Sequence, residues 1–548
     1  MKRTVNKLCI ILLIAVFYLG CGSPQIQTNA DPITEQDILT HLKELSKDEY
    51  MGRMPFGPGD KMTVDYLVNQ CKALGLKPGN GGSFTQEVPM IEVESTPTSN
   101  MSIQSPSGTL NYEYGEDYVI NSLKTVDVIE VEEAPIVFYG YGIVDEKLNW
   151  NDFEGVNPQG KIGIVLVNDP GFGGEDSTFF KGNTMTYYGR WTYKYEEADR
   201  QGLKGLLIIH ETSSAGYPWF VVQSSWGGPQ LGLEKESVQQ GADIKGWIHL
   251  ETAKSLFEAS NLDLSELIKQ ARTPGFKAVE LNASLSTSLA NTYKRDVSEN
   301  VVAYIEGSTN PEEYILYSAH WDHIGVGNPV NGDSIYNGAL DNASGTGISL
   351  AIAGKLAKQD PKPERSIVFT WVTAEEQGLL GSEYYALNPT FPINQTVCNI
   401  NIDGCNPHGP MKDFQIIGHG HSEMDKIAEQ ALKAQDRYVL PDQEPEKGYF
   451  FRSDHFNFAK VGIPALFGRG GYDHVEKGIE YGKKKSAEYT ANNYHAPSDE
   501  YDANTWDMTG VIQDAELYRA IGLKLANSNT WPQWDESSEF RRQKDITD

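Results

Sequence analysis

The sequence has few cysteines and few basic residues for its length, and both shortages exclude classes of protein. Five of its 548 residues are cysteine, too few for a fold held together by disulfides. Acidic residues outnumber basic residues by 75 to 46, so the formal net charge is −29. A surface of this sign repels nucleic-acid phosphates and anionic lipid headgroups, and we expect no nucleic acid partner.

Two familiar catalytic motifs are also missing. No Gly-x-Ser-x-Gly elbow occurs, which argues against a serine hydrolase of that type. No His-Glu-x-x-His pair occurs, which argues against a thermolysin-type metal site. Chemically active residues are therefore sought at the ends of the predicted strands.

Residues 1–21 have the pattern of an export signal. Basic residues come first, an apolar run at 10–19 follows that is too short for a membrane span, and the segment ends in Gly20-Cys21. It resembles a bacterial lipoprotein leader with Cys21 as the lipidated residue, although Tyr18-Leu19 departs from the usual leucine-first box. Ordinary cleavage and an uncleaved anchor are the alternatives. We expect an exported protein of the periplasm or cell envelope, with the membrane as a partner only through a lipid on Cys21.

The second half of the chain alternates between short apolar strands and amphipathic helices. The pattern predicts strands at 314–317, 366–372, 397–402 and 463–467, and helices at 344–358, 378–387, 421–434 and 508–527. This alternation predicts an α/β fold with a mixed, mostly parallel sheet sandwiched by helices. In such a sheet the chemistry gathers in the loops that follow the strands.

Five candidate metal ligands lie in these loops. They are His320, Asp341, Glu376, Asp403 and His495. Two imidazoles and three carboxylates suit zinc or a similar divalent ion. Because a carboxylate has two oxygens, one of the three can bridge two ions about 3.5–4 Å apart, which would polarise a carbonyl and generate hydroxide at neutral pH.

Taken in order, these residues resemble the co-catalytic zinc aminopeptidases and their glutamate carboxypeptidase-like relatives, peptidase clan MH, family twenty-eight. The resemblance covers essentially the mature chain and implies the zinc exopeptidase fold with two Zn2+ per chain. It implies that Asp341 bridges the ions, that His320 and Asp403 complete one site, and that Glu376 and His495 complete the other. An aminopeptidase that acts on peptides is the favoured function.

The same resemblance assigns three further residues. Glu375 matches the general base that takes a proton from the bridging water, Asp322 a carboxylate that orients His320, and Tyr494 a phenol that donates to the developing oxyanion. A metal-bound carboxylate has lost its basicity to the ion, so the proton falls to Glu375 rather than to its neighbour Glu376. We expect hydrolysis by a zinc-bridging hydroxide.

Residues 130–270 differ from the rest in their many glycines and short β-rich runs. The Gly140-Tyr-Gly142 and Gly160-Lys-Ile-Gly patterns resemble an inserted protease-associated domain. We therefore divide the chain into a leader (1–21), a tether (22–31), an N-terminal part of the peptidase domain (32–129), the protease-associated domain (130–270), the zinc peptidase core (271–530) and a polar tail (531–548).

Three other functions stay open. A carboxypeptidase of the same family would need a cationic pocket, for which Arg452 and Arg469 are the local candidates. A glutaminyl cyclase-like enzyme with one metal is disfavoured because five ligands point to two ions. A receptor-like binding protein is disfavoured because the ligands and the base are all present.

Several residues also have ordinary structural interpretations. Asp341 could cap the following helix. Glu375 and Glu376 could stabilise the first turn of a helix by interacting with its dipole. His323 is either a positioning residue or a plain loop residue. In the family, the segment that carries Arg452, Asp454 and His455 lines the substrate cleft, so these three are candidate substrate-binding residues. Side-chain specificity, oligomeric state and a possible Cys398–Cys405 bridge stay open.

Overall fold

The computed structural model describes residues 31–542 of the chain. The predicted leader with Cys21 and nearly all of the predicted tether lie outside the described residues. Among the helices of residues 31–542, none is long and apolar enough to cross a membrane.

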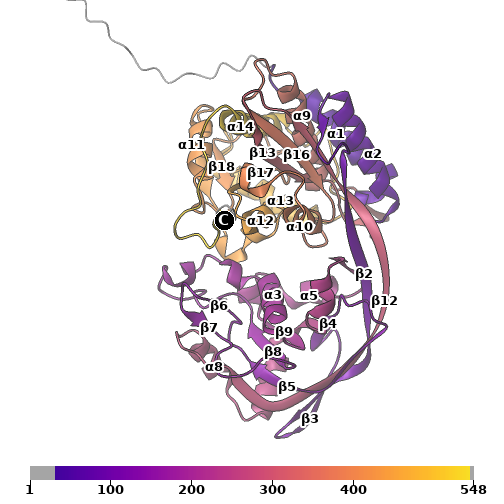
Figure 1. The fold of residues 1–548 in the computed structure, drawn as a ribbon, viewed down its shortest axis with the longest axis vertical. Coiled ribbons are helices and arrows are strands. Elements are labelled where there is room, and N and C mark those ends of the chain that lie inside the picture. Colours follow the sequence, from indigo (N-terminus) through magenta and orange to yellow (C-terminus); the bar gives the residue numbers. More distant parts are fainter. Residues whose placement is uncertain (1–30, 543–548) are drawn as a thin grey trace, which may run out of the picture.

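Two bodies lie one above the other in Figure 1, and a single sheet runs through both. Its strands are β1 (Lys77–Pro78), β2 (Thr85–Ser105), β3 (Gly108–Tyr112), β4 (Tyr118–Asn121), β5 (Val128–Phe138), β8 (Ile162–Leu166), β9 (Gly205–His210), β10 (Gln230–Leu233), β11 (Ile244–His249), β12 (Val279–Ile305), β13 (Asn310–His320), β16 (Arg365–Val372), β17 (Thr396–Asn401), β18 (Asp413–Ile416), β19 (Tyr438–Pro441) and β20 (Ala465–Gly470). Two small hairpins pair β6 (Val144–Asp145) with β7 (Trp150–Asn151) and β14 (Gly325–Val330) with β15 (Asp333–Tyr336).

The α-helices are distributed between the two bodies. They are α1 (Glu35–Leu45), α2 (Pro58–Ala73), α3 (Trp191–Gln201), α4 (Thr212–Ala215), α5 (Trp219–Ser225), α6 (Glu236–Gln240), α7 (Leu250–Ala259), α8 (Leu264–Ala271), α9 (Gly345–Ala357), α10 (Leu380–Leu387), α11 (Met424–Lys433), α12 (His455–Lys460), α13 (Ile479–Asn492) and α14 (Met508–Ala526). We call the body with α1, α2 and α9–α14, which contains the predicted peptidase core, the peptidase body and the other the second body.

The peptidase body is a sheet covered by helices on both faces. Its central strands β16, β13, β17 and β20 are parallel, while β12 and β18 pair antiparallel at either side. Side chains alternate along β13, so that Ile315 and Tyr317 point into the core under α9 and α14, while Leu316 points into the core with Tyr385 of α10 and Phe458 of α12. This arrangement confirms the predicted α/β fold with a mostly parallel sheet.

Two unusually long strands connect the bodies. β2 has 21 residues and β12 has 27, and they pair with each other over most of their length. The first part of β12 pairs with β5 of the second body, whereas its last residues, Val301–Ile305, pair with β16 of the peptidase body. Figure 1 shows both strands arching along one side of the molecule.

The second body has its own hydrophobic core. Parallel strands β5, β8, β9 and β11 form its centre, and its core begins at Met101 on β2. The packing therefore draws residues upstream of position 130 into this body, because β2 passes from one core to the other without a turn that the sequence could signal. The resemblance of this body to a protease-associated domain stays a prediction.

Several local features go beyond what the sequence analysis predicts. Thr34 and Asp37 form a capping box at the start of α1. Three stretches that the sequence left as loop or tail are ordered: a 3-10 helix at Asp48–Arg53, helix α13, and the tail, where Trp534 donates to the Gly462 carbonyl at 3.0 Å. Among residues 31–542 the cysteines are buried and unbridged, so the Cys398–Cys405 disulfide does not form.

Candidate metal centre

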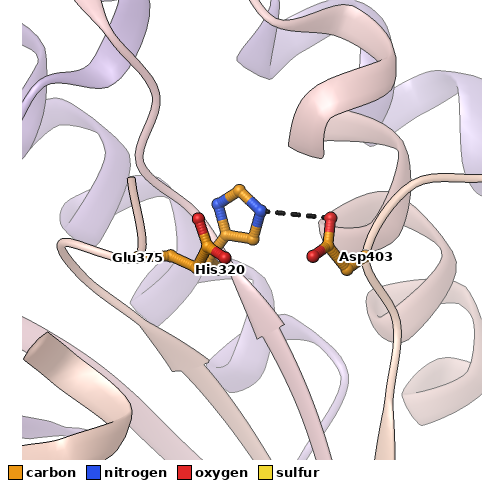
Figure 2. Close-up of side chains that lie close together, drawn as sticks. All are labelled: His320, Glu375 and Asp403. Carbon is orange, nitrogen blue, oxygen red and sulfur yellow. Dashed lines mark hydrogen bonds and ion pairs between the residues drawn. The ribbon is translucent and has the colours of Figure 1, made fainter. Parts of the chain in front are cut away.

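The predicted ligands come from five separate loops and meet above the parallel strands. His320 is the last residue of β13, Glu376 follows β16, and Asp403 follows β17. Asp341 lies in an irregular turn before α9, and His495 lies in the loop after α13. The carboxyl ends of neighbouring parallel strands share one edge of the sheet, which is why residues so far apart in sequence converge. Figure 2 shows His320 facing Asp403 with Glu375 beside them.

Asp341 stands between two groups of ligands. Its Oδ1 lies 3.4 Å from His320 Nε2, and its Oδ2 lies 3.3 Å from His495 Nε2. On one side His320 Nε2 is also 3.4 Å from Asp403 Oδ1, and on the other His495 Nε2 is 3.1 Å from Glu376 Oε2. One oxygen of Asp341 therefore points to each group.

These separations fit bound cations. Ligand atoms about 2.0–2.2 Å from one tetrahedral ion lie roughly 3.4 Å from one another, which is the spacing seen here. Two groups of residues each bring their potential ligand atoms within 4.8 Å of one another. One group is His320, Glu375 and Asp403, and the other is His323, Asp341 and Glu376. So many buried carboxylates in one place repel each other unless cations neutralise them, so the residues present fit divalent metal.

His323 lies within this group of residues. The sequence analysis left open whether it is a positioning residue or a loop residue. Its Nδ1 lies 2.6 Å from Glu376 Oε1, and its Nε2 is buried with no hydrogen-bond partner among the described residues. The ring also lies edge-on to that of His495, with 5.8 Å between centroids. His323 either orients Glu376 or offers its own nitrogen to a metal. The position of His323 three residues after His320 does not show, from sequence alone, whether it has one of these roles or is an ordinary loop residue.

Asp322 holds the two glutamates as well as His320. It is fully buried, and its carboxylate accepts hydrogen bonds from the Glu375 amide at 3.0 Å and the Glu376 amide at 3.3 Å. Its Oδ1 lies 3.8 Å from His320 Nδ1, while its main-chain oxygen lies 3.2 Å from the same nitrogen. The carboxylate thus fixes the turn on which Glu375 and Glu376 point in different directions.

Glu375 has the surroundings of a general base. Its side chain is buried. Burial raises the pKa of Glu375 well above its usual value, and Asp403 and Glu376 add to the effect, while His320 opposes it. A carboxylate that binds no metal keeps the basicity that a metal-bound carboxylate gives up to the ion, so Glu375 suits a base better than the predicted ligand Glu376.

Arg53 is a second positioning residue, and no sequence motif predicts its role. The side chain is completely buried and donates to four main-chain carbonyls: Trp321 (2.8 Å), Leu45 (2.6 Å), Asn337 (2.6 Å) and Gly338 (3.0 Å). Burial lowers its pKa to about 10, opposed first by Asp322, so it stays charged at neutral pH. Trp321 follows His320, and Asn337 and Gly338 precede the turn of Asp341, so one cation joins the two loops beneath these predicted metal ligands.

Asp499 fixes the turn that carries Asp341. Its carboxylate accepts the amides of Leu340 and Asp341, both with a nearest distance of 3.0–3.1 Å. The Asp341–Asn342 peptide bond is cis, and Asn342 Oδ1 accepts the Gly404 amide at 2.9 Å. The Asn342 side chain, which also donates to the Ile402 carbonyl at 3.1 Å, ties the Asp341 turn to the loop of Asp403.

The remaining predicted residues lie at different depths. Tyr494 is half exposed, and its ring stacks on His495 with 3.9 Å between centroids. Asp454 is completely buried, and burial raises its pKa to about 7, with His320 opposing. His455 is completely buried between the rings of Phe450 and Phe467, which is a core position rather than a cleft wall.

The two arginines considered for a cationic pocket also differ in their exposure to solvent. Arg452 is partly buried, and its guanidinium lies 5.0 Å from the centre of the Tyr449 ring. Arg469 is exposed on β20.

Comparison with known proteins agrees with this site. Residues 300–520 match the model of Peptidase family M28, and this region contains every predicted metal ligand. The chain therefore carries a Peptidase family M28 domain. Relatives include the mouse protein named Aminopeptidase NAALADL1, 32% identical over 422 residues, which is 67% of this chain and 52% of that protein. The probable leucine aminopeptidase 2 of Aspergillus oryzae is 30% identical over 278 residues, 48% of this chain and 49% of the relative.

The chain spans about half the length of these curated relatives. Among solved structures, the aminopeptidase from Aneurinibacillus sp. strain AM-1 is 17% identical with a TM-score of 0.47, and the alignment covers 93% of this chain and 98% of that one.

Proposed function

We propose that the protein is a zinc-dependent exopeptidase, and that it removes N-terminal residues from peptides as an aminopeptidase. One observation carries the proposal: Asp341 directs one carboxylate oxygen to each of two ligand groups, His320 with Asp403 and His495 with Glu376. This arrangement fits two ions that share a carboxylate. The names of the mouse and Aspergillus relatives support the aminopeptidase assignment.

The residues divide the work of amide hydrolysis among them. Zinc bound here would polarise the scissile carbonyl and lower the pKa of water. Glu375 is placed to take the proton of the attacking water and to return it to the leaving amine, because it is buried beside His320 and Asp403 yet distinct from Glu376. The Tyr494 hydroxyl can donate to the oxyanion, because a phenol stays protonated at neutral pH.

The alternatives are distinguished by the substrate end that the enzyme requires. A carboxypeptidase of this family would hydrolyse amino-blocked peptides with a free carboxylate. A glutaminyl cyclase-like enzyme would cyclise N-terminal glutamine without hydrolysis, and a receptor would do neither. The proposal also includes export and lipidation at Cys21.

The test is hydrolysis of leucine p-nitroanilide and of its N-acetyl derivative by the zinc-loaded protein. We expect turnover of the free-amino substrate only. Glu375→Gln should lower kcat by about 10²–10⁴-fold while zinc content is unchanged, because it removes proton transfer and no metal ligand. Glu312→Gln, at an exposed position on β13, is the matched control and should behave as wild type. Loss of zinc in Glu375→Gln, or full activity in it, would contradict the assignment of the base.

A further inference from the structure

The last described residues of the chain, 531–542, pack on the peptidase body, and we call them the strap. The Trp534 indole donates to the Gly462 carbonyl at 3.0 Å. Phe540 is 6% exposed, and its ring centre lies 5.1 Å from that of Trp534 and 5.9 Å from that of Phe450. These two large rings bury apolar surface, which fastens the strap to the peptidase body.

One charged side chain of the strap reaches the second body. Glu539 directly precedes Phe540, and its Oε2 pairs with Lys181 Nζ at 2.7 Å, while its Oε1 accepts from the Tyr187 amide at 3.3 Å. The Glu539 side chain is 11% exposed and the Lys181 side chain 29%, so the ion pair is largely shielded from water. Removing one partner of such a pair is costly, because the other charge stays buried without compensation.

The same segment of the second body also contacts the peptidase body directly. The Met185 amide donates to the Pro445 carbonyl at 3.1 Å. The Tyr187 ring centre lies 5.0 Å from that of Phe456, and the ring centre of Phe540 lies 6.2 Å from Phe456 as well. One hydrophobic cluster joins Met185 of the second body, Phe456 of the peptidase body and Phe540 of the strap. The strap is therefore part of the contact between the bodies.

A further contact between the bodies lies at the turn of the proposed base. Ala374, the residue before Glu375, is buried in one hydrophobic cluster with Leu231 and Leu233 of β10. This strand belongs to the second body and pairs with β2. The second body therefore supports the Glu375 turn only while the two bodies are in contact.

The covalent connections between the bodies lie away from the strap. Figure 1 shows the yellow C-terminal stretch on the side of the molecule opposite to the arch of β2 and β12. Residues 291–300 of β12 pair with β2 and with no other strand of residues 31–542. Residues 292–297 are all exposed, so neither face of β12 is packed on a core there. A two-stranded ribbon without a core beneath it bends more easily than either body.

We propose that the strap holds the two bodies closed on each other, with Glu539 as its contact to the second body and residues 292–297 of β12 as the hinge on the opposite side. When this contact is lost the bodies move apart at the strap, so that Met185 leaves Pro445 and β10 leaves the turn of Glu375. The closed arrangement is the one that binds substrate well, so the strap sets the fraction of molecules that are competent to bind.

The first test is amide hydrogen exchange in Glu539→Gln, which removes the charge and keeps the size of the side chain. We expect the Met185 amide, which donates to the other body, to exchange about 5–20-fold faster than in wild type. Exchange in α9 should be unchanged. Glu536→Gln, at an exposed position of the strap, is the matched control and should behave as wild type. Faster exchange confined to the strap and Tyr187, with Met185 unchanged, would overturn the proposal.

The partner of Glu539 gives an independent check by the same measurement. Lys181→Met leaves the more deeply buried Glu539 without compensation, so Met185 should exchange at least as fast as in Glu539→Gln. The double variant leaves no charge without a partner, and its exchange should be slower than that of Lys181→Met alone. Additive effects of the two substitutions would mean that the residues act separately and would contradict the proposed contact.

The kinetic consequence rests on the proposed peptidase function. In Glu539→Gln combined with Phe540→Ala, which removes the charge and a buried ring, we expect KM for leucine p-nitroanilide to rise about 3–10-fold. Zinc content should be unchanged and kcat should stay within about twofold of wild type, because the molecules that bind substrate are closed. A fall in kcat or zinc content at unchanged KM would contradict closure by the strap. If the wild type hydrolyses no peptide, the peptidase function fails, and the exchange of Met185 still decides whether the strap closes the bodies.

Discussion

The two bodies both bury charged groups, but they balance them differently. In the second body Lys194 donates to the carbonyls of Tyr141 (2.5 Å) and Asn168 (3.0 Å), with Asp152 and Asp169 within electrostatic range. Each of these acids accepts hydrogen bonds from nearby donors, Asp152 from the Ile143 amide and Asp169 from Thr186, for example. We call these three residues the Lys194 cluster.

The metal centre of the peptidase body has no such balance. Its buried acids Asp322, Asp341, Glu375 and Glu376 face histidines and one another, and the cation among them, Arg53, gives its hydrogen bonds to main-chain carbonyls. A buried cluster with internal partners stabilises a fold, whereas one with excess charge of one sign marks a ligand site.

The largest expected effect is that of Arg53→Met. Removing this cation takes a donor from four carbonyls, of which that of Gly338 still accepts from the Ala343 amide, and removes a positive charge from the nearby acids. We therefore expect a loss of about 3–5 kcal/mol in the free energy of unfolding, measured by urea denaturation. Zinc affinity, measured by competition with a chelator, should fall as well. Arg53→Lys should recover part of both. Unchanged zinc affinity in a folded Arg53→Met protein would contradict its positioning role.

Lys194→Met tests the other side of the comparison. It removes two hydrogen bonds and leaves Asp152 and Asp169 without their cation, and we expect a loss of about 2–3 kcal/mol. Zinc content should be unchanged, because the cluster lies in the second body. Adding Asp152→Asn and Asp169→Asn should recover part of the stability. A fall in zinc content would show that the two clusters are not independent.

His455 is a buried titratable group that is kept neutral rather than balanced by an opposite charge. Burial lowers the pKa of His455 to about 3, below the value near 6.5 of the unfolded chain. The native state therefore binds fewer protons than the unfolded state below pH 6.5, so this contribution is complete above pH 6.5 and is lost as the pH falls. Between pH 6.5 and pH 5 the loss is about 2 kcal/mol.

The measurement is unfolding free energy against pH for His455→Phe, which keeps an aromatic ring among Phe450 and Phe467. Its slope below pH 6.5 should be shallower than that of the wild type. His419→Gln, at an exposed position, serves as the control. An unchanged slope in His455→Phe would assign the acid sensitivity to other groups.

The smallest effect is expected for an ion pair that is partly exposed to water. Lys355 of α9 pairs with Asp37 of α1 at 2.8 Å, with side chains 16% and 33% exposed. Lys355→Met should cost about 0.5–1 kcal/mol and leave zinc content and activity unchanged. A loss as large as that of Lys194→Met would mean that burial does not set the scale of these effects.

The sequence predicted the parts of the fold that have strong local signals. The alternation of apolar strands and amphipathic helices gave β13, β16, β17, β20 and the helices between them, because a buried parallel sheet requires that pattern. Helix α13 was missed because its face is largely polar, with a single buried residue, Gly482. The passage of β2 through both cores was missed because no turn residue marks the crossing.

The strand pattern also predicted part of the candidate site, but it did not predict the residues that position the ligands. Ligands at strand ends meet whatever the details of packing, so His320, Glu376 and Asp403 could be brought together from sequence. Arg53 could not, because its partners lie up to 285 positions away and are main-chain carbonyls that no side-chain pattern encodes.

The most direct measurement is zinc content by mass spectrometry of dialysed protein, followed through a zinc titration with Tm recorded at each point. The account predicts about two zinc ions per chain, a Tm that rises until both are bound, and the same stoichiometry in Lys194→Met. Less than one zinc per chain at saturation, or a Tm that does not respond to zinc, would contradict the claim that the acidic excess of the peptidase body is a two-metal site.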